Sequence, residues 1–322
     1  MSADSPSASA VICTFRGKQF VERQLETIMA QTRVPDELVI FDDASDDGTY
    51  ELLQSLARVL AVPVTLHQQK SRIGVAGNFS QAMAAAQGDV ILLSDQDDEW
   101  SERRVEVSLK VLVSDGCDLM FSDAEIIDAN GKPLGRRFWD EIRFKDDERR
   151  QCESGECLEV LLRHSVMMGA TMGFLSKWRT LLLPVDVSGL HDVWIAVLLA
   201  AVGRVVAVPE PLVRYRQHSG NQVGVRPRSP SARLTHRRSA LARYGDEVAQ
   251  VNALCARLSE SNFASSRTLS LMRQKLEHLE ARAAIGRGDR RLRTAFSELR
   301  AGRYARFSRG WESALFDLVL RR

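Results

Sequence analysis

The feature that most constrains the fold is a regular alternation, over the first 127 residues, of short apolar segments with amphipathic stretches of about a dozen residues. A short apolar run between polar residues is typical of a buried strand, and apolar residues repeated every three to four positions indicate one face of a helix. The predicted strands cover residues 9–15, 37–43, 64–68, 89–94 and 118–127, and the predicted helices cover residues 20–31, 49–60, 75–87 and 102–113. Strands that alternate with helices build βαβ units, so we predict an α/β fold with a mostly parallel sheet.

The second half of the chain has a different pattern. It is irregular from residue 131 to about residue 150, and it then contains predicted helices at 155–164 and 191–202, a strand at 167–175, and short strands at 205–208 and 212–216. A Pro- and Ser-rich stretch near Pro227 and Ser229 indicates a linker, and polar amphipathic helices follow at 232–260 and 265–286. We therefore predict an α/β domain over residues 1–225 and a helical extension over residues 226–322.

Charge is distributed unevenly between these two parts. The whole chain has a formal net charge of +2, but residues 226–322 hold 21 Lys and Arg against 9 Asp and Glu, a net charge of +12 that leaves −10 on the remainder. An acidic domain suits cation binding, and a basic extension suits an anionic surface. The alternative is that the extension is simply an arginine-rich, solvated helical region. We predict no nucleic-acid partner.

Three features indicate a cytoplasmic protein. No run reaches the ~18 apolar residues of a membrane-spanning helix, and the first ten residues lack the basic and apolar regions of a secretory signal. The five cysteines are scattered, and nothing near the closest pair, Cys152 and Cys157, completes a zinc site. We therefore predict free thiols in a reducing cytoplasm.

The strongest functional signal is an acidic cluster at residues 93–100, where four acids lie within five positions directly after a predicted strand. Like charges this close raise one another's pKa, and a divalent cation removes that cost. Mg²⁺ and Mn²⁺ prefer carboxylate oxygens and keep positions open for phosphate oxygens. The spacing of Asp95 and Asp97 suits one carboxylate facing a sugar hydroxyl and the next facing a metal. The alternative is a solvated acidic turn.

A second acidic cluster, residues 41–49, also follows a predicted strand and then opens a helix. The carboxyl ends of parallel strands meet at one edge of the sheet, where open α/β folds bind ligands. Asp42 and Asp43 could accept hydrogen bonds from a base or a ribose, so we predict nucleotide binding for them. Asp46 and Asp47 suit the capping of the following helix.

Three weaker segments complete the set. Residues 72–79 place two glycines at a helix start, which allows close approach of a ligand but also fits a plain helix start. Asp192, in residues 189–194, could act as a general base, or it could simply sit in a first helical turn favoured by the helix dipole. In residues 213–221, His218 could ligate a metal, and Arg214 and Arg216 could neutralise phosphate. A lone surface histidine is the usual alternative.

Taken together and in this order, the segments resemble family 2 glycosyltransferases of the GT-A fold, and among them the rhamnosyltransferase-like group of bacterial surface polysaccharide synthesis. The resemblance covers about residues 9–225, and its most diagnostic parts are LSDQDDEW at 93–100 and YRQH at 215–218 followed by Asn221. It implies an inverting enzyme that moves a sugar from a nucleotide diphosphate to a saccharide or lipid-linked saccharide, with Mn²⁺ or Mg²⁺ as cofactor. dTDP-rhamnose is the expected donor, and a UDP-hexose is the runner-up.

The resemblance also implies roles for individual residues. Asp192 would be the catalytic base, and Asp97 and His218 would be the metal ligands. The expected nucleotide-sugar contacts are Thr14, Phe15, Arg16, Asp42, Asp43, Arg72, Gly74, Asn78, Asp95 and Gln96. The expected contacts with acceptor or phosphate are Asp98, Trp100, His191, Trp194, Arg214 and Arg216.

Three positions depart from the family pattern. Arg16 stands where many relatives carry Asn, which would change donor contacts, and Phe15 replaces a usual Tyr. Val193 stands where this group often has Trp, which would change contacts with the acceptor.

Two other classes of protein fit the sequence less well than a glycosyltransferase. A nucleotidyltransferase would need a Gly-rich basic loop near the first strand, where this chain has only residues 16–18, RGK. A catalytically silent scaffold of a polysaccharide assembly complex is opposed by the presence of Asp97, Asp192 and His218 together.

Residues 303–322 mix aromatic and aliphatic residues with arginine, which suits an interfacial helix on anionic lipid or a helix docked on the catalytic domain or a second subunit.

Overall fold

The computed structural model describes residues 5–218, 237–285 and 291–319. Its described strands form one sheet of nine in the order β3-β2-β1-β4-β8-β6-β9-β5, with β7 paired to β6 beside this path. The strands are β1 (Ala8–Thr14), β2 (Glu37–Asp42), β3 (Val64–Gln68), β4 (Val90–Asp95), β5 (Glu99–Trp100), β6 (Leu119–Ile127), β7 (Pro133–Arg137), β8 (Met172–Leu175) and β9 (Val205–Arg216). The pairs β1–β2, β2–β3, β1–β4 and β6–β9 are parallel, whereas β8 is antiparallel to β4 and β6. The predicted α/β fold with a mostly parallel sheet is confirmed.

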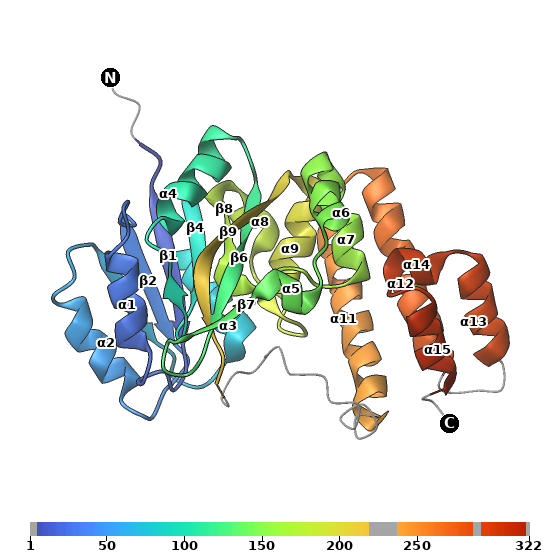
Figure 1. Cartoon of the computed structure of the whole chain (residues 1–322), viewed down its shortest axis with the longest axis horizontal. Coiled ribbons are helices and arrows are strands. Elements are labelled where there is room, and N and C mark those ends of the chain that lie inside the picture. The colour runs from blue at the N-terminus through green and yellow to red at the C-terminus, as the bar shows by residue number, and fades with distance from the viewer. Residues whose placement is uncertain (1–4, 219–236, 286–290, 320–322) are drawn as a thin grey trace.

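Helices cover both faces of this sheet and continue beyond it (Figure 1). Those up to β9 are α1 (Val21–Met29), α2 (Thr49–Ala57), α3 (Gly74–Ala85), α4 (Arg104–Leu109), α5 (Phe138–Ile142), α6 (Asp146–Gln151), α7 (Cys157–Arg163), α8 (Arg179–Leu182) and α9 (His191–Val202). Those of the extension are α11 (Arg237–Ser261), α12 (Ser266–Ile285), α13 (Arg291–Arg300), α14 (Arg303–Phe307) and α15 (Trp311–Val319). Short π-helical turns, η1 (Lys110–Ser114) and η2 (Cys152–Glu156), and the 3-10 turns η3 (Gly169–Thr171) and η4 (Ser176–Trp178) join them.

The central strands feed two hydrophobic cores, because successive side chains of a strand point to opposite faces of the sheet. On β1, Val11 belongs to one core and Ile12 to the other. Helices α1, α2 and α4 close the Ile12 side, and α3 and α9 close the Val11 side. Strand β1 is buried along its whole length, as expected for a strand that is covered on both faces.

The extension continues the core on the α9 side of the sheet. Leu254 and Leu258 of α11 and Met272 of α12 are buried in the same hydrophobic cluster as Val11 and Leu198. Figure 1 shows α11 beside α9, with α12 to α15 stacked beyond it at the opposite end of the molecule from α1 and α2. The helical extension therefore shares a core with the α/β part, while the predicted linker around residues 227–229 lies outside the described residues.

Several element boundaries differ from the prediction for physical reasons. Residues 205–216 form a single strand, β9, and register shifts in its pairing with β6 absorb Pro209 and Pro211, which cannot donate to the ladder. The helix predicted at 102–113 becomes a π-helical turn after Leu109. The strand predicted at 167–175 is extended only over β8, and the irregular stretch 131–150 contains β7, α5 and α6.

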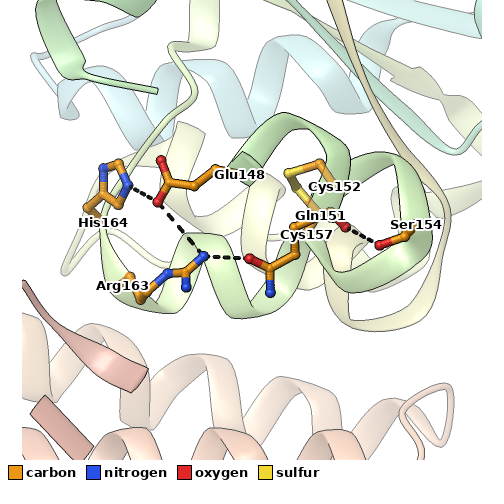
Figure 2. Close-up of a disulfide and its surroundings, with 7 residues drawn as sticks. All are labelled: Glu148, Gln151, Cys152, Ser154, Cys157, Arg163 and His164. Atoms are coloured by element: carbon orange, nitrogen blue, oxygen red, sulfur yellow. Dashed lines mark hydrogen bonds and ion pairs between the residues drawn. A yellow bond between two sulfur atoms is a disulfide. The ribbon is translucent and has the colours of Figure 1, made fainter. Parts of the chain in front are cut away.

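The prediction of five free thiols is wrong for one pair. Cys152 and Cys157 form a disulfide at the start of α7 (Figure 2). A turn at Gly155, with φ of 89°, brings the two residues together. Close by, His164 Nε2 lies 2.9 Å from a carboxylate oxygen of Glu148. The free cysteines are Cys13, Cys117 and Cys255.

The last described helices dock on the chain itself. Tyr304 and Phe307 of α14 are buried, and α14 packs against α7 and α12. In α15, Asp317 faces inward, whereas Trp311 and Leu315 are exposed. Of the two uses predicted for the tail, docking is therefore realised by α14 and by one face of α15. None of the described helices is both long and apolar enough to cross a lipid bilayer.

Candidate active site

The acidic cluster after β4 meets the end of β9. Asp95 ends β4, and the chain then turns through Asp97 into β5, whose Glu99 pairs with Arg214 of β9. This pairing brings His218, which follows β9, against the cluster: its Nε2 lies 2.8 Å from Oδ2 of Asp97. The structure thus brings the two predicted metal ligands, which are far apart in sequence, into direct contact.

Charged side chains tie this loop to β9. Asp98 is buried, and its Oδ1 accepts a hydrogen bond from the backbone N–H of Arg216 over 2.9 Å. Glu99 accepts from Arg214 and, over 2.7 Å, from Arg216, which also donates to the Asp97 carbonyl over 2.7 Å. The sequence predicted contacts of Asp98, Arg214 and Arg216 with acceptor or phosphate. In the structure these side chains fix the loop that carries Asp97, and their contacts with acceptor or phosphate stay a prediction.

A buried arginine beneath the cluster escaped the sequence prediction. The guanidinium of Arg104, on α4, lies 4.0 Å from the ring centroid of Trp100 and donates to the Leu93 carbonyl over 2.7 Å. One of its terminal nitrogens has no hydrogen-bond partner among the described residues. The available sequence signal was its position on the helix. Arg104, Ser108 and Leu112 are spaced four residues apart and therefore share one face, and all three are buried.

Burial and mutual repulsion shift the pKa values of this cluster. Burial, and then the charges of Asp97 and Asp192, raise the pKa of Asp95 to about 7. Burial also raises the pKa of Asp98 well above its usual range, and Asp97 and Asp95 add to that rise. Burial lowers the pKa of Arg104 to about 9, although Asp98 and Asp95 favour its charged form. Oδ2 of Asp98 also lacks a partner in the described chain, so the protein leaves a buried polar atom of this cluster without a hydrogen bond.

Asp192 reaches the same cluster from the first turn of α9. Its charge raises the pKa of Asp95, so the two carboxylates lie within electrostatic reach of each other. Its Oδ1 accepts the Val193 N–H over 2.7 Å. Next to it, the buried ring of His191 stacks on Phe79 with 4.1 Å between centroids, and neither ring nitrogen has a partner among the described residues. Burial lowers the pKa of His191, which favours a neutral imidazole.

The acidic cluster after β2 is satisfied internally. The fully buried Asp42 accepts hydrogen bonds from Thr14 Oγ1 and from the Ser45 N–H, both over 2.8 Å. Asp43 accepts from the N–H groups of Ile73 over 2.7 Å and Gly74 over 2.9 Å, at the start of α3. These carboxylates therefore shape the loops at this edge of the sheet. Their contacts with a base or ribose stay a prediction.

Gln96 joins this edge to the first cluster. Its side-chain amide accepts the Phe15 N–H over 2.8 Å and donates to the Phe15 carbonyl over 3.0 Å. The guanidinium of Arg72 lies 4.0 Å from the Phe15 ring centroid. Arg16 forms an exposed ion pair of 2.7 Å with Asp46. The structure therefore groups Phe15, Arg72 and Gln96, as expected for residues that would line one ligand.

Three other predicted contact residues point into the protein. Asn78 donates to the Phe41 carbonyl over 2.7 Å and ties α3 to β2. Trp194 donates from its indole to the Leu182 carbonyl over 2.8 Å, and Trp100 is buried under Arg104. These side chains support the site from behind, and their contacts with a ligand stay a prediction.

The carboxylate of Asp97 and the imidazole of His218 are donor types that would suit a divalent cation. Within the described ranges, no group of three or more His, Cys, Asp and Glu side chains is arranged to hold a metal ion alone. A carboxylate and an imidazole suit Mn²⁺, and Mg²⁺ and Mn²⁺ commonly complete their shells with phosphate oxygens and water.

An open depression of about 510 Å³ lies in another part of the described chain. It is formed by α5, α6 and the loop between them, and its walls include Trp139, Arg143 and Lys145. None of the site residues predicted from the sequence lines it.

Comparison with known proteins identifies related sequences. Residues 9–159 match the family model described as "Glycosyl transferase family 2". The putative teichuronic acid biosynthesis glycosyltransferase TuaG of Bacillus subtilis is 26% identical over 132 residues, which cover 41% of this chain and 52% of that protein. The chain thus spans about half the length of this curated relative. The UDP-Glc:alpha-D-GlcNAc-diphosphoundecaprenol beta-1,3-glucosyltransferase WfgD of Escherichia coli is 23% identical over 195 residues, which cover 58% of this chain and 74% of that protein.

A solved structure agrees with the fold. The mannosyltransferase PcManGT from Pyrobaculum calidifontis, in complex with GDP-Man and Mn²⁺, aligns over 94% of this chain and 76% of its own length, with a TM-score of 0.56 and 18% sequence identity. At that identity the likeness concerns the fold alone. Residues 9–159 therefore match the family 2 glycosyl transferase model over a little under half of the chain, and the described residues adopt a fold of the GT-A type.

Proposed function

We propose that this protein is a metal-dependent, inverting glycosyltransferase that moves a sugar from a nucleotide diphosphate to a saccharide or lipid-linked saccharide acceptor. The observation that carries the proposal is the 2.8 Å contact between Asp97 and His218, with Asp192 in electrostatic reach of Asp95 in the same cluster. Scattered acids of a silent scaffold would have no reason to converge at the carboxyl ends of β4 and β9.

The geometry suggests a division of tasks. Asp97 and His218 would hold the cation against the donor diphosphate, and a divalent cation bound there offsets the negative charge that grows on the leaving group. In an inverting transfer, the acceptor oxygen bonds to the anomeric carbon on the face opposite the breaking bond to the diphosphate. Asp192 then takes the proton of the acceptor hydroxyl as that bond forms.

The sharpest test of this proposal is Asp192→Asn. The variant keeps the shape of the side chain but loses its basicity, so we expect kcat to fall by roughly 10²–10⁴-fold while donor binding stays within a factor of about two. Release of nucleoside diphosphate in Mn²⁺ measures the first quantity, and calorimetric titration with the nucleoside diphosphate measures the second. A variant that turns over at the parental rate would remove Asp192 from the mechanism.

The donor and the acceptor are proposed from the sequence resemblance and from the names of relatives. The resemblance favours dTDP-rhamnose, and the name of the relative WfgD, which includes UDP-Glc, supports a UDP-hexose as the alternative. That name also supports a diphosphate-linked lipid saccharide as acceptor, and the name of TuaG supports a place in surface polysaccharide synthesis. Hydrolysis of a panel that contains both donors would decide between them.

We further propose a peripheral contact with the anionic inner face of the cytoplasmic membrane. Trp311 and Leu315, one turn apart on α15, are 71% and 51% exposed, and Phe296 on α13 is exposed between Arg293 and Arg300. Aromatic and aliphatic side chains beside arginine suit the lipid interface. We expect the parent to float with phosphatidylglycerol vesicles but not with phosphatidylcholine vesicles. The double substitution Trp311→Glu and Leu315→Glu should abolish flotation, whereas Val59→Glu, at another exposed apolar position, should not.

A further inference from the structure

The first helix of the extension, α11, donates hydrogen bonds to the segment that leads to Asp192. The guanidinium of Arg257, on α11, donates to the carbonyl oxygens of Leu181 over 3.0 Å, Leu183 over 2.8 Å and Pro184 over 3.0 Å. These carbonyls lie at and just beyond the end of α8, where a helix leaves its last carbonyl groups without internal partners. One cation therefore satisfies three acceptors of this segment.

Further contacts connect the carbonyls that Arg257 holds to the start of α9. Trp194 donates from its indole to the carbonyl of Leu182, inside the group of carbonyls that Arg257 holds, and the Arg257 guanidinium lies 5.3 Å from the Trp194 ring centroid. Gln250, also on α11, donates over 3.4 Å to the carbonyl of Leu190, which in turn accepts the Trp194 N–H over 3.1 Å. Leu190 and Trp194 bracket Asp192 in the sequence.

We propose that Arg257 is a positioning residue, which fixes the α8–α9 segment so that Asp192 points at the acidic cluster. The inference rests on the proposed function, in which Asp192 is the general base. It makes the extension part of the catalytic apparatus, because α11 supplies the anchor and the α/β part supplies the base. A misplacement of the base by about 1 Å can cost on the order of 10²-fold in rate, so such an anchor has measurable consequences.

A purely structural role for Arg257 predicts a different pattern, and the chain offers a matched control. Lys275, on α12, also anchors the extension to the α/β part by donating to main-chain carbonyls, those of Leu162 at the end of α7 and Phe307, each over 2.9 Å. Among the described residues, Lys275 makes no hydrogen bond to the segment that leads to Asp192. If the extension only stabilises the fold, Arg257→Ala and Lys275→Met should lower activity in step with stability.

The test compares Arg257→Ala, Arg257→Lys, Gln250→Ala and Lys275→Met in the full chain. The probe reaction is release of nucleoside diphosphate from dTDP-rhamnose or UDP-glucose, whichever the parent hydrolyses faster, in Mn²⁺ and well below each melting temperature. We expect Arg257→Ala to lower kcat about 10- to 100-fold with KM for the donor within about twofold. Arg257→Lys should recover part of the loss, Gln250→Ala should lose a few-fold, and Lys275→Met should keep the parental kcat.

A double variant separates this inference from the proposed function. If Arg257 acts through Asp192, adding Arg257→Ala to Asp192→Asn should cause no further loss of kcat, because the group being positioned is already inactive. Multiplicative losses in the double variant, or a parental kcat for Arg257→Ala and Gln250→Ala, would overturn the inference and leave the proposed function standing. A parental kcat for Asp192→Asn alone would remove Asp192 as the general base of the proposed function, and the inference, which rests on that role, would fall with it. Should Arg257→Ala fail to fold, Gln250→Ala in the same double-variant design gives the answer.

Discussion

Two clusters of charged and polar side chains in this molecule are built in opposite ways. In the extension, the fully buried Asp317 accepts hydrogen bonds from Tyr244 over 3.0 Å, Arg282 over 2.7 Å and Tyr304 over 3.0 Å. After β4, Asp95, Asp97 and Asp98 crowd together, and Oδ2 of Asp98 and one Arg104 nitrogen have no partner in the described chain. The first cluster is satisfied in itself, and the second is not.

The difference separates structural from functional use of buried charge. A buried carboxylate that has all its partners holds elements together, and removing it leaves its cation uncompensated. A buried carboxylate without enough partners raises the free energy of the empty protein, and such groups gather where a ligand is to supply the missing charge. We therefore expect substitutions in the two clusters to have opposite profiles in activity and stability.

The largest expected effect is on activity, for Asp97→Asn. Loss of a cation ligand should lower kcat/KM by roughly 10³-fold, the equivalent of several kcal/mol of lost charge stabilisation in the transition state. Stability should change by no more than about 0.5 kcal/mol, because one of several crowded negative charges is removed. Nucleoside diphosphate release at several Mn²⁺ concentrations and urea unfolding measure the two quantities. Unchanged activity together with a large loss of stability would reverse the roles assigned to the clusters.

The opposite profile is expected for Asp317→Ala. The change leaves the buried Arg282 without its carboxylate and removes acceptors from two tyrosines, so the free energy of unfolding should fall by about 3–5 kcal/mol. Activity per folded molecule, measured at low temperature, should stay within about twofold of the parent. Asp317→Asn keeps the acceptor oxygen and should lose less stability. Equal losses for Ala and Asn would mean that the charge of Asp317 accounts for the whole loss and that the acceptor oxygen kept by Asn contributes nothing.

The acidic cluster after β4 could be located from the sequence, because acids that directly follow a strand are visible in one dimension. Asp97 and His218 could be paired in advance only through the family resemblance, since β5, the strand that brings them together, has two residues and no periodicity. The apolar patterns predicted β3 and α9 to the residue.

Long-range partnerships were out of reach of the sequence. The sequence neighbours of Asp317 and Arg257 do not show that Asp317 is buried or that Arg257 holds the segment after α8. Their partners come from segments tens of residues away. The disulfide between Cys152 and Cys157 was missed because it depends on the turn at Gly155, and spacing alone does not report a positive φ. Arg214 and Arg216 were predicted to neutralise phosphate because of their charge, and nothing in the sequence indicated that both also pair with Glu99 across the sheet.

The smallest expected effect concerns Lys275, which extends the comparison to a buried cation. Burial lowers its pKa to about 8 from an ordinary value of 10.5, although its ammonium donates to two main-chain carbonyls. Because the folded-state pKa lies below the unfolded one, the unfolded chain binds more protons between pH 8 and 10.5, and this group's contribution to stability rises with pH in that window. Below pH 8 the lysine is charged in both states, and the cost of burying the charge is fully present. From pH 8 to 9.5 the free energy of unfolding of the parent should gain about 1.5 kcal/mol relative to Lys275→Met, as measured by urea unfolding at each pH. Parallel curves for the two proteins would mean that the two carbonyls fully replace the hydration of the Lys275 ammonium.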